Sequence, residues 1–114
     1  GTKAGTVRVK DIAPGTAASN PANLTAVGKT VYFMAWTNAA GPELWKSNGT
    51  KAGTVRVKDI RPGADGSGPH DMVAMGGTLY FSANDGIHGV ELWKSGGTAA
   101  TTVMVKDINT QSAP

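Results

Sequence analysis

Two histidines and a few carboxylates are the residues of this chain that could do acid–base chemistry. His70 stands beside Asp71, and a His–Asp pair can orient a general base. His88 stands apart from this pair, and no Gly-x-Ser-x-Gly motif supplies an activated serine. The chain contains no cysteine, which excludes a thiol nucleophile, a disulfide and a thiolate metal site. The sequence therefore predicts that the protein is not an enzyme, with a small hydrolase as a remote alternative.

Two aspartates lie in oxygen-rich loops that resemble cation-binding turns. Asp65 precedes Gly66, and Asp85 stands between Asn84 and Gly86. A calcium loop needs several spaced carboxylates, and each of these loops has one. Turn formation explains both segments better than a bound ion. We therefore expect neither a metal nor a cofactor, and Asp85 and Asp65 are weak candidate ligands.

The motif ELWKS occurs twice and combines an aromatic ring with a carboxylate. It begins at Glu43 and again at Glu91, and the Trp of each copy shares a strand face with its Glu. Such a pair could bind a sugar, but the favoured interpretation is that the Trp fills the gap between packed sheets. Trp36 has no counterpart 48 residues later and is the better surface contact. The candidate ligand contacts are Trp36, Trp45, Trp93, Glu43 and Glu91.

The net charge of +3 is modest and does not indicate a nucleic-acid partner. Basic residues alternate with valines in three similar segments, VRVKDI, VRVKDI and VMVKDI, but no stacking aromatic residues interleave with them. A solvated sheet edge is the better interpretation. No apolar run approaches the roughly 20 residues of a membrane helix, so we expect no membrane insertion.

These residues are set in an internal repeat. Residues 1–48 align with residues 49–96 without a gap, and 28 of the 48 positions are identical. Residues 1–12 and 49–60 are the same letter for letter, and a third, degraded copy begins at Gly97. The boundaries expected from this repeat are an extra N-terminal strand at 1–12, repeats at 13–60 and 61–108, and a tail at 109–114.

Each repeat is expected to form four strands joined by Gly-, Asn- and Pro-rich turns. Both faces of the strong strand TVYFMAWT are apolar, which indicates a sheet covered on both sides. The sequence therefore predicts an all-β fold of two four-stranded antiparallel, propeller-like blades plus one extra strand. The expected strands are Asn23–Val27, Thr30–Thr37, Pro42–Ser47, Thr54–Ile60, Asp71–Met75, Thr78–Ala83, Val90–Ser95 and Thr102–Ile108, with Thr6–Ile12 as the extra one.

The stretches ELWKSNGTKAGTVRVKDIRPG and GGTLYFSANDGIHGVELWKSGGT resemble the bacterial ELWxxDGT repeat family. Those repeats occur in tandem in large secreted or surface proteins and look like β-propeller blades, so the resemblance implies an extracellular or cell-surface location. The Asp that precedes Gly-Thr in the family is Asn48 in one copy and Gly96 in the other. The family has no defined biochemical activity to transfer, so the resemblance bears on the fold more than on the function.

Two blades cannot close a ring, and their outermost apolar faces would meet water. Even a few hundred Å² of exposed apolar surface per face costs several kcal/mol, at about 25 cal/mol per Å². We therefore predict self-association, into an oligomeric propeller or a filament, with copies of the same chain as partners. A glycan-binding propeller is the alternative, and the chain as part of a longer array is a third reading. The residues expected to pair between subunits are Thr6, Val7, Arg8, Val9, Lys10, Asp11, Ile12, Thr102, Val103, Met104 and Val105.

Overall fold

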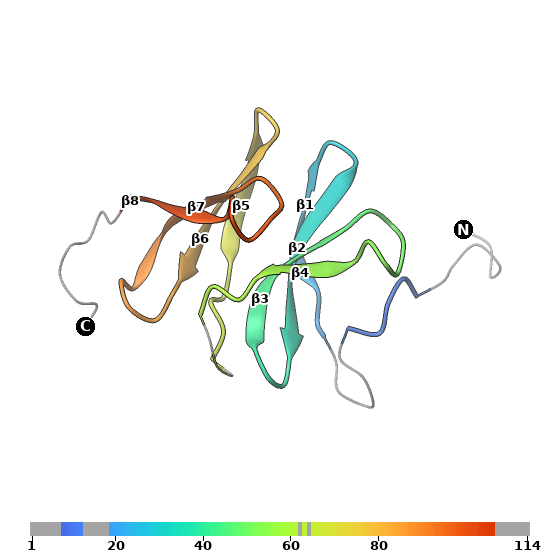
Figure 1. Cartoon of the computed structure of the whole chain (residues 1–114), viewed down its shortest axis with the longest axis horizontal. Helices are drawn as coiled ribbons and strands as arrows, with labels where there is room; N and C mark the ends of the chain where they lie inside the picture. The colour runs from blue at the N-terminus through green and yellow to red at the C-terminus, as the bar shows by residue number, and fades with distance from the viewer. Residues whose placement is uncertain (1–7, 13–18, 62, 64, 107–114) are drawn as a thin grey trace.

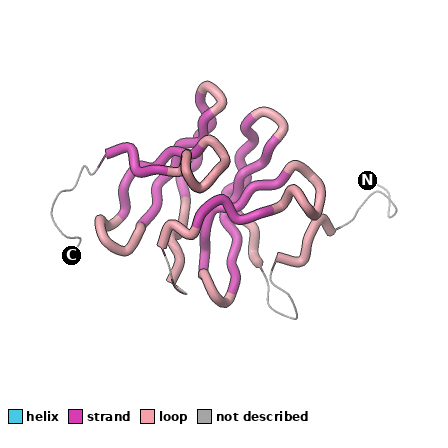
Figure 2. The backbone as a smooth tube through the Cα atoms, in the orientation of Figure 1, coloured by secondary structure: helices cyan, strands magenta, loops and turns pink. Residues whose placement is uncertain are grey.

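The computed structural model describes residues 8–12, 19–61, 63 and 65–106. This part of the chain forms two four-stranded antiparallel sheets and contains no helix (Figures 1 and 2). In each sheet the strands follow one another in chain order, so every strand pairs with its neighbour in sequence. The prediction of an all-β fold with two four-stranded antiparallel sheets is therefore confirmed.

Sheet 1 comes from the first half of the chain and sheet 2 from the second. Tight turns such as Gly28 and Gly76 join their first two strands, and both glycines adopt positive φ, of 61° and 60°. The strands of sheet 1 are β1 (Ala22–Val27), β2 (Thr30–Thr37), β3 (Gly41–Ser47) and β4 (Val55–Lys58). The strands of sheet 2 are β5 (His70–Met75), β6 (Thr78–Asn84), β7 (Val90–Ser95) and β8 (Val103–Lys106).

β4 is shorter than the predicted Thr54–Ile60, whereas β8 begins one residue later than predicted and the last two predicted residues, 107 and 108, lie outside the described part of the chain. β4 ends at Lys58, and Ile60 leaves the sheet to join the core. The pairing of β3 with β4 shifts between Leu44 and Trp45, and such a bulge bends and shortens a strand. β7 and β8 show the same shift between Leu92 and Trp93.

The prediction of an extra N-terminal strand is wrong for the part of it that the structure describes. Thr6 and Val7 lie outside them, and Arg8–Ile12 form no strand. A strand of this type pairs with the ELWKS strand before it, as β4 pairs with β3. Among the described residues, no such strand lies free beside residues 8–12, and they join neither sheet. The described residues therefore form eight strands and not nine.

Residues 48 positions apart occupy equivalent places in the two sheets. The amide N–H of Trp36 donates to the carbonyl of Ser19 at 2.7 Å, and that of Asn84 donates to Ser67 at 3.0 Å. The first strand of each sheet carries a bulge and a residue with positive φ, Asn23 at 59° and its counterpart Asp71 at 54°. The second unit thus repeats the backbone details of the first.

Each sheet has two apolar faces, which we call front and back. The front face carries Val31, Phe33, Ala35 and Trp45 in sheet 1, and Leu79, Phe81, Ala83 and Trp93 in sheet 2. The back face carries Tyr32, Leu44 and Val57 in sheet 1, and Tyr80, Leu92 and Val105 in sheet 2. The faces are assigned from the alternation of side chains along β2 and β6 and from the pairing of these strands with β3 and β7. Val57 and Val105 are assigned to the back face because each lies at the register shift of its strand.

The main core forms where the back face of sheet 1 meets the front face of sheet 2. The sheets lie side by side, and their first strands, β1 and β5, contact each other (Figure 1). Tyr32, Leu44 and Val57 pack there against the front-face residues of sheet 2, and Ile60 joins them. A smaller cluster of Phe33, Ala35 and Trp45 covers the front of sheet 1.

Candidate functional site

The contact between the two sheets shows which side chains pack against the back face of sheet 1 and the front face of sheet 2. Leu44 is fully buried in it, and Val57 is 6% exposed. Opposite them lie Leu79 and Phe81, both also fully buried. Burial of these apolar side chains is the main stabilising contribution to the contact.

Polar contacts from sheet 1 fix its position against the loop between β7 and β8. The Nζ of Lys46 donates to the carbonyl of Gly97 at 2.6 Å, and the Nζ of Lys58 donates to that of Thr102 at 3.0 Å. A Cβ added at Gly97 would lie 2.8 Å from the hydroxyl of Tyr32. The loop therefore needs a glycine where Tyr32 approaches its backbone.

Residues 8–12 sit on the front of sheet 1 as the identical residues 56–60 sit on the front of sheet 2. The Nζ of Lys10 donates to the carbonyl of Thr54 at 2.9 Å, which matches the bond from Lys58 to Thr102. Each lysine also lies 6.0 Å from the ring centre of a tryptophan, Lys10 over Trp45 and Lys58 over Trp93. Ile12 packs against the smaller cluster as Ile60 packs in the main core.

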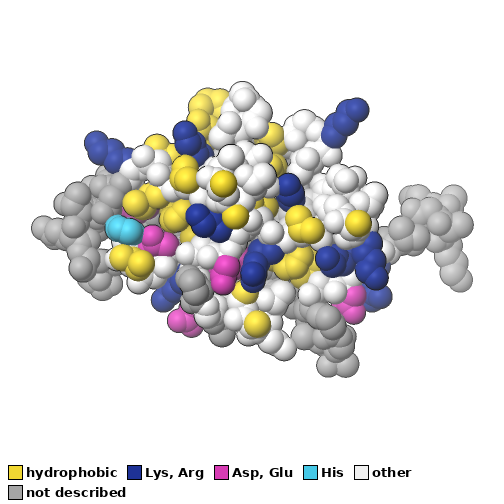
Figure 3. Space-filling model, in the orientation of Figure 1, with side chains coloured by type: hydrophobic (Ala, Val, Ile, Leu, Met, Phe, Trp, Pro, Cys, Tyr) yellow, Lys and Arg dark blue, Asp and Glu magenta, His cyan; other side chains and the backbone are white. Residues whose placement is uncertain are grey.

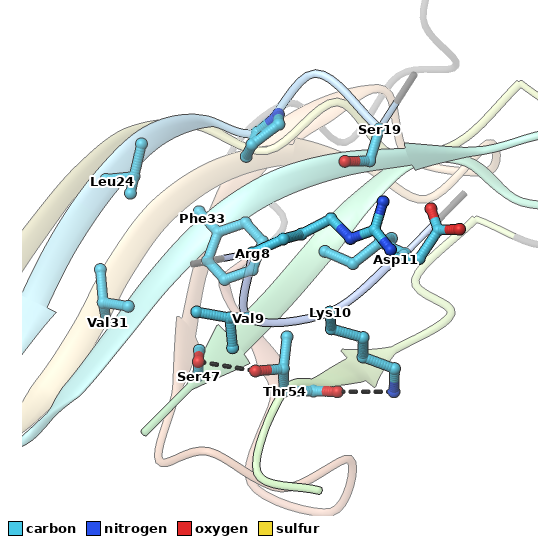
Figure 4. Close-up of a pocket in the computed structure, with 12 residues that line it drawn as sticks. Arg8, Val9, Lys10, Asp11, Ser19, Leu24, Val31, Phe33, Ser47 and Thr54 are labelled. Atoms are coloured by element: carbon cyan, nitrogen blue, oxygen red, sulfur yellow. Dashed lines mark hydrogen bonds between the residues drawn. The ribbon is translucent and has the colours of Figure 1, made fainter. Parts of the chain in front are cut away.

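A cavity of about 440 Å³ remains between residues 8–12 and the front of sheet 1 (Figure 4). Its apolar lining comes mainly from Val9, Ile12, Leu24, Val31 and Phe33. At the matching position on sheet 2, the side chains of Tyr32 and Leu44 fill the space. The cavity therefore lies on the front of sheet 1 at the position that Tyr32 and Leu44 occupy on the front of sheet 2.

The back face of sheet 2 is open to solvent. Leu92 is 38% exposed, whereas its counterpart Leu44 is fully buried. Val105 is 44% exposed, whereas its counterpart Val57 is 6% exposed. Residues 8–12 and β8 lie on opposite sides of the molecule, so the cavity and the open face point away from each other (Figure 1).

The predicted strand-pairing residues therefore fall into two separate places. Arg8, Val9, Lys10 and Asp11 line the cavity together with Ile12. Val103, Met104 and Val105 belong to β8, whereas Thr102 precedes it and is fully buried. The hydroxyl of Thr102 bonds to Ser95 and Thr98, each at 2.7 Å, so it stabilises the loop between β7 and β8.

The ELWKS glutamates and tryptophans are buried. Glu43, Trp45, Glu91 and Trp93 are all inaccessible or nearly so, and neither ELWKS motif offers an exposed ring or carboxylate to a sugar. The indole N–H groups of Trp45 and Trp93 have no hydrogen-bond partner among the described residues. The positions of the two rings agree with the interpretation that they fill space between packed surfaces.

Glu43 ties the sheet to the segment that connects the two sheets. Its carboxylate accepts the amide N–H of Arg61 at 3.0 Å and the hydroxyl of Ser67. Burial raises the pKa of Glu43 to about 7, and nearby Asp59 acts in the same direction, against the hydrogen bonds from Ser67 and Arg61. Glu43 is therefore a structural acid that titrates near neutral pH.

Trp36 is the one candidate ligand contact with a large exposed surface, at 42%. It lies near the end of β2, and its backbone is held by Ser19. Asn84 takes the corresponding place in β6, so this exposed ring is a feature of sheet 1 alone.

The two candidate metal ligands act in turns. Asp85 accepts the amide N–H groups of Ile87 and His88, at 2.9 and 2.8 Å, and contacts the His88 ring at 2.7 Å. Burial of Asp85 opposes its charge, but the hydrogen bonds from His88 and Ile87 outweigh it and lower the pKa. Asp65 is exposed and lies 3.6 Å from Arg61.

Groups of three or more His, Asp or Glu side chains that could hold a metal do not occur among the described residues. The exposed pair His70 and Asp71 is 3.7 Å apart, and the His70 ring also contacts the carbonyl of Gly68. Lys and Arg side chains lie in several separate places on the visible surface, interspersed with hydrophobic and acidic ones (Figure 3). No helix in the described part of the chain is long and apolar enough to cross a bilayer.

Comparison with known protein families, curated proteins and solved structures finds no match to this chain. Function must therefore be inferred from the chain's own contacts.

Sequence reasoning missed the contact of Tyr32 and Lys46 with Gly97. The signal was present, because Tyr32 and Lys46 have identical counterparts in Tyr80 and Lys94, and Gly97 has one in Gly49. A polar contact between one unit and the next was not deduced from that identity.

Proposed function

We propose that this protein is a non-enzymatic module that associates with copies of itself, head to tail. The open back face of sheet 2 in one copy docks on the front face of sheet 1 in the next. The observation that carries this proposal is the exposure of Leu92 and Val105, whose counterparts are buried within the chain. An apolar face that is buried in one sheet and bare in the other indicates a missing neighbour.

A second copy is the occupant because the chain already contains the required complementary surface. Tyr80 and Leu92 repeat Tyr32 and Leu44, which fill the front of sheet 2. The front of sheet 1 presents Phe33, the counterpart of Phe81, beside an apolar cavity. The contact between copies thus reuses side chains that already pack together once in the chain.

The proposed contact also has a polar part that can be stated by residue. By analogy with Lys46 and Gly97, the Nζ of Lys94 in one copy donates to the carbonyl of Gly49 in the next. Tyr80 would then lie over Gly49 as Tyr32 lies over Gly97. Within the chain, the space around the Cβ position of Gly49 is open to 4 Å, which leaves room for that ring.

Repetition of this contact gives an oligomeric propeller if the rotation closes and a filament if it does not. The resemblance of the ELWKS segments to the ELWxxDGT repeats supports blade-like units and an extracellular or cell-surface location. Electron microscopy of the purified protein distinguishes rings of a few chains from long polymers.

The direct test places a charge on the open face. We expect Leu92→Asp to keep the chain folded but monomeric in sedimentation velocity, because a buried carboxylate opposes docking. The matched control is Ile87→Asp, an equally apolar exposed residue in the loop before β7, which should assemble like the wild type. A wild-type protein that stays a folded particle of 11.6 kDa at high concentration would refute the proposal.

A glycan-binding module is the second candidate, and the exposed ring of Trp36 supports it. An exposed tryptophan can stack on a sugar face, and its polar edge can remain in water. A glycan array with the wild type and Trp36→Ala tests this candidate. Binding that is lost in the variant supports it, and a blank array with folded protein refutes it.

A further inference from the structure

We propose that in the assembly residues 8–12 of one copy replace β8 of its neighbour as the fourth strand of the neighbour's sheet 2. This inference rests on the self-association proposed above and specifies how the two copies join. It makes the N-terminal segment a donated strand and β8 the strand that leaves. The assembly would then be held by main-chain hydrogen bonds as well as by apolar packing.

If two copies dock as sheets 1 and 2 do, β8 of one copy and residues 8–12 of the next would occupy the same position. Val9 and Val105 are both counterparts of Val57, and Lys10 and Lys106 are both counterparts of Lys58. Within the chain, β4 fills this place: it pairs with β3 and also lies against sheet 2. At the junction between copies, β8 of one copy and residues 8–12 of the next would have to lie there together. Only one of them can.

Residues 8–12 already make the contacts that this place requires. Lys10 donates to Thr54 and lies over Trp45, and Ile12 packs on the cluster below. Val103 and Val105 of β8 are exposed, and Val9 is exposed to a similar degree while no strand pairs beside it. The segment on sheet 1 is therefore preformed for the junction, and it lacks only a neighbouring strand to pair with.

The sequence of the incoming segment also fits the sheet that would receive it. Arg8 would stand opposite Trp93, as its counterpart Arg56 stands opposite Trp45. β8 places Met104 there, and Met104 packs against the main core. The exchange gives up that packing, and the aliphatic part of Arg8 takes its place over the tryptophan.

The register follows from the pairing of β3 with β4. Leu44 pairs with Lys58, so Leu92 of one copy should pair with Lys10 of the next. In the separate chain, Leu92 pairs with Lys106. Directly paired residues of antiparallel strands are close enough for a disulfide, and the chain has no other cysteine to interfere.

The first experiment traps the exchanged strand in the full chain. Lys10→Cys and Leu92→Cys in one chain should form covalent dimers and higher multimers under mild oxidation, at least tenfold more than the pair Lys10→Cys and Ile87→Cys. Multimers at the level of that control pair would overturn the exchange.

The second experiment locks β8 in place with Leu92→Cys and Lys106→Cys, oxidised at low concentration. The locked chain should not assemble, and reduction should restore assembly. A locked chain that assembles as well as the reduced one would overturn the exchange and leave self-association intact. A wild type that does not assemble at all would instead overturn the proposed function.

Hydrogen exchange of the wild type needs no substitution and covers the case in which a cysteine variant fails to fold. On assembly, the amides of β8 should lose protection, and those of residues 8–12 should gain it at least tenfold. Protection of β8 that is kept or increased in the assembled protein would overturn the exchange.

Discussion

Sheet 1 and sheet 2 have the same strand order, the same registers and the same bulges, yet their back faces differ in their exposure to solvent. Leu44 and Val57 are buried, whereas Leu92 and Val105 meet solvent. The side chains are identical in type, so the difference comes from what lies next to them. Sheet 1 has sheet 2 as its neighbour, and sheet 2 has no neighbour on its back face among the described residues.

The front faces differ in the complementary way. The front of sheet 2 is filled by the preceding sheet, whereas the front of sheet 1 holds residues 8–12 and a cavity. Residues 8–12 cover part of the front of sheet 1. The comparison thus identifies one complete contact between the two sheets, an exposed back face on sheet 2 and a partly filled front face on sheet 1.

The largest expected effect is a difference in the free energy of unfolding between substitutions at the two equivalent leucines, Leu44 and Leu92. Leu44→Ala should lower the free energy of unfolding by about 3 kcal/mol, because it leaves a cavity in the main core. Leu92→Ala should lower it by less than about 1 kcal/mol in the monomer, since that side chain is partly solvated. Urea unfolding at a concentration too low for assembly measures both, and equal losses would contradict the assignment of faces.

The pH dependence of stability tests the role of Glu43, which bonds to the segment that connects the two sheets. The pKa of Glu43 is raised to about 7 in the folded chain from an ordinary value of 4.5, so the folded chain retains a proton that the unfolded chain has lost. The resulting stability is fully present below about pH 4.5 and is lost as the pH rises through 7.

We expect wild-type stability to fall by about 2 kcal/mol between pH 5 and pH 8, a discounted figure for a carboxyl group of this shift. Glu43→Gln keeps the neutral form and should flatten most of this fall. The difference between the two pH profiles is the quantity to measure, because contributions common to both chains cancel in it. Parallel profiles would argue against a neutral Glu43.

The paired glycines test the polar part of the junction. Gly97 and Gly49 have similar positive φ, 103° and 94°, so alanine strains both backbones alike. Gly97→Ala also meets the hydroxyl of Tyr32, whereas Gly49→Ala meets open space. We expect Gly97→Ala to be about 1 kcal/mol more destabilising in the monomer, by thermal unfolding. Equal losses would mean that Tyr32 shifts aside without penalty.

The smallest effect concerns the two lysines. Lys58→Met removes a bond that joins the sheets and should lower global stability by at most about 1 kcal/mol. Lys10→Met removes the corresponding bond, from Lys10 to the carbonyl of Thr54. In the monomer that bond holds only residues 8–12 in place. The substitution should leave the unfolding free energy unchanged and speed amide exchange in residues 8–12. A global loss from Lys10→Met as large as that from Lys58→Met would show that the segment belongs to the folding unit.

The strands were predictable because local chemistry decides them. The turn at Gly28 and the apolar strand beginning at Thr30 have clear counterparts at Gly76 and Thr78, and the observed strands follow them. The burial of Trp45 agrees with the favoured interpretation of that ring, whereas the burial of Glu43 was not predicted. Local pattern and packing agree in these segments.

The state of residues 8–12 was not predictable from their letters, because they are identical to 56–60. Val57 lies in a strand and Val9 does not, since β4 has β3 beside it and residues 8–12 have no such strand. Pairing depends on a partner elsewhere in the chain, which a strand's own sequence does not encode. The raised pKa of Glu43 likewise depends on burial and on nearby Asp59, and both act on Glu43 only in the folded structure.

The cavity and the open face lie on different sides of the chain and cannot substitute for each other. If copies add head to tail, every assembly has two unlike ends, and growth has a direction. A Leu92→Asp chain keeps its cavity side intact, so it could still join one end and then accept no further copy there. Small amounts of that variant would act as a chain terminator, and the length of the assemblies would report its proportion in the mixture.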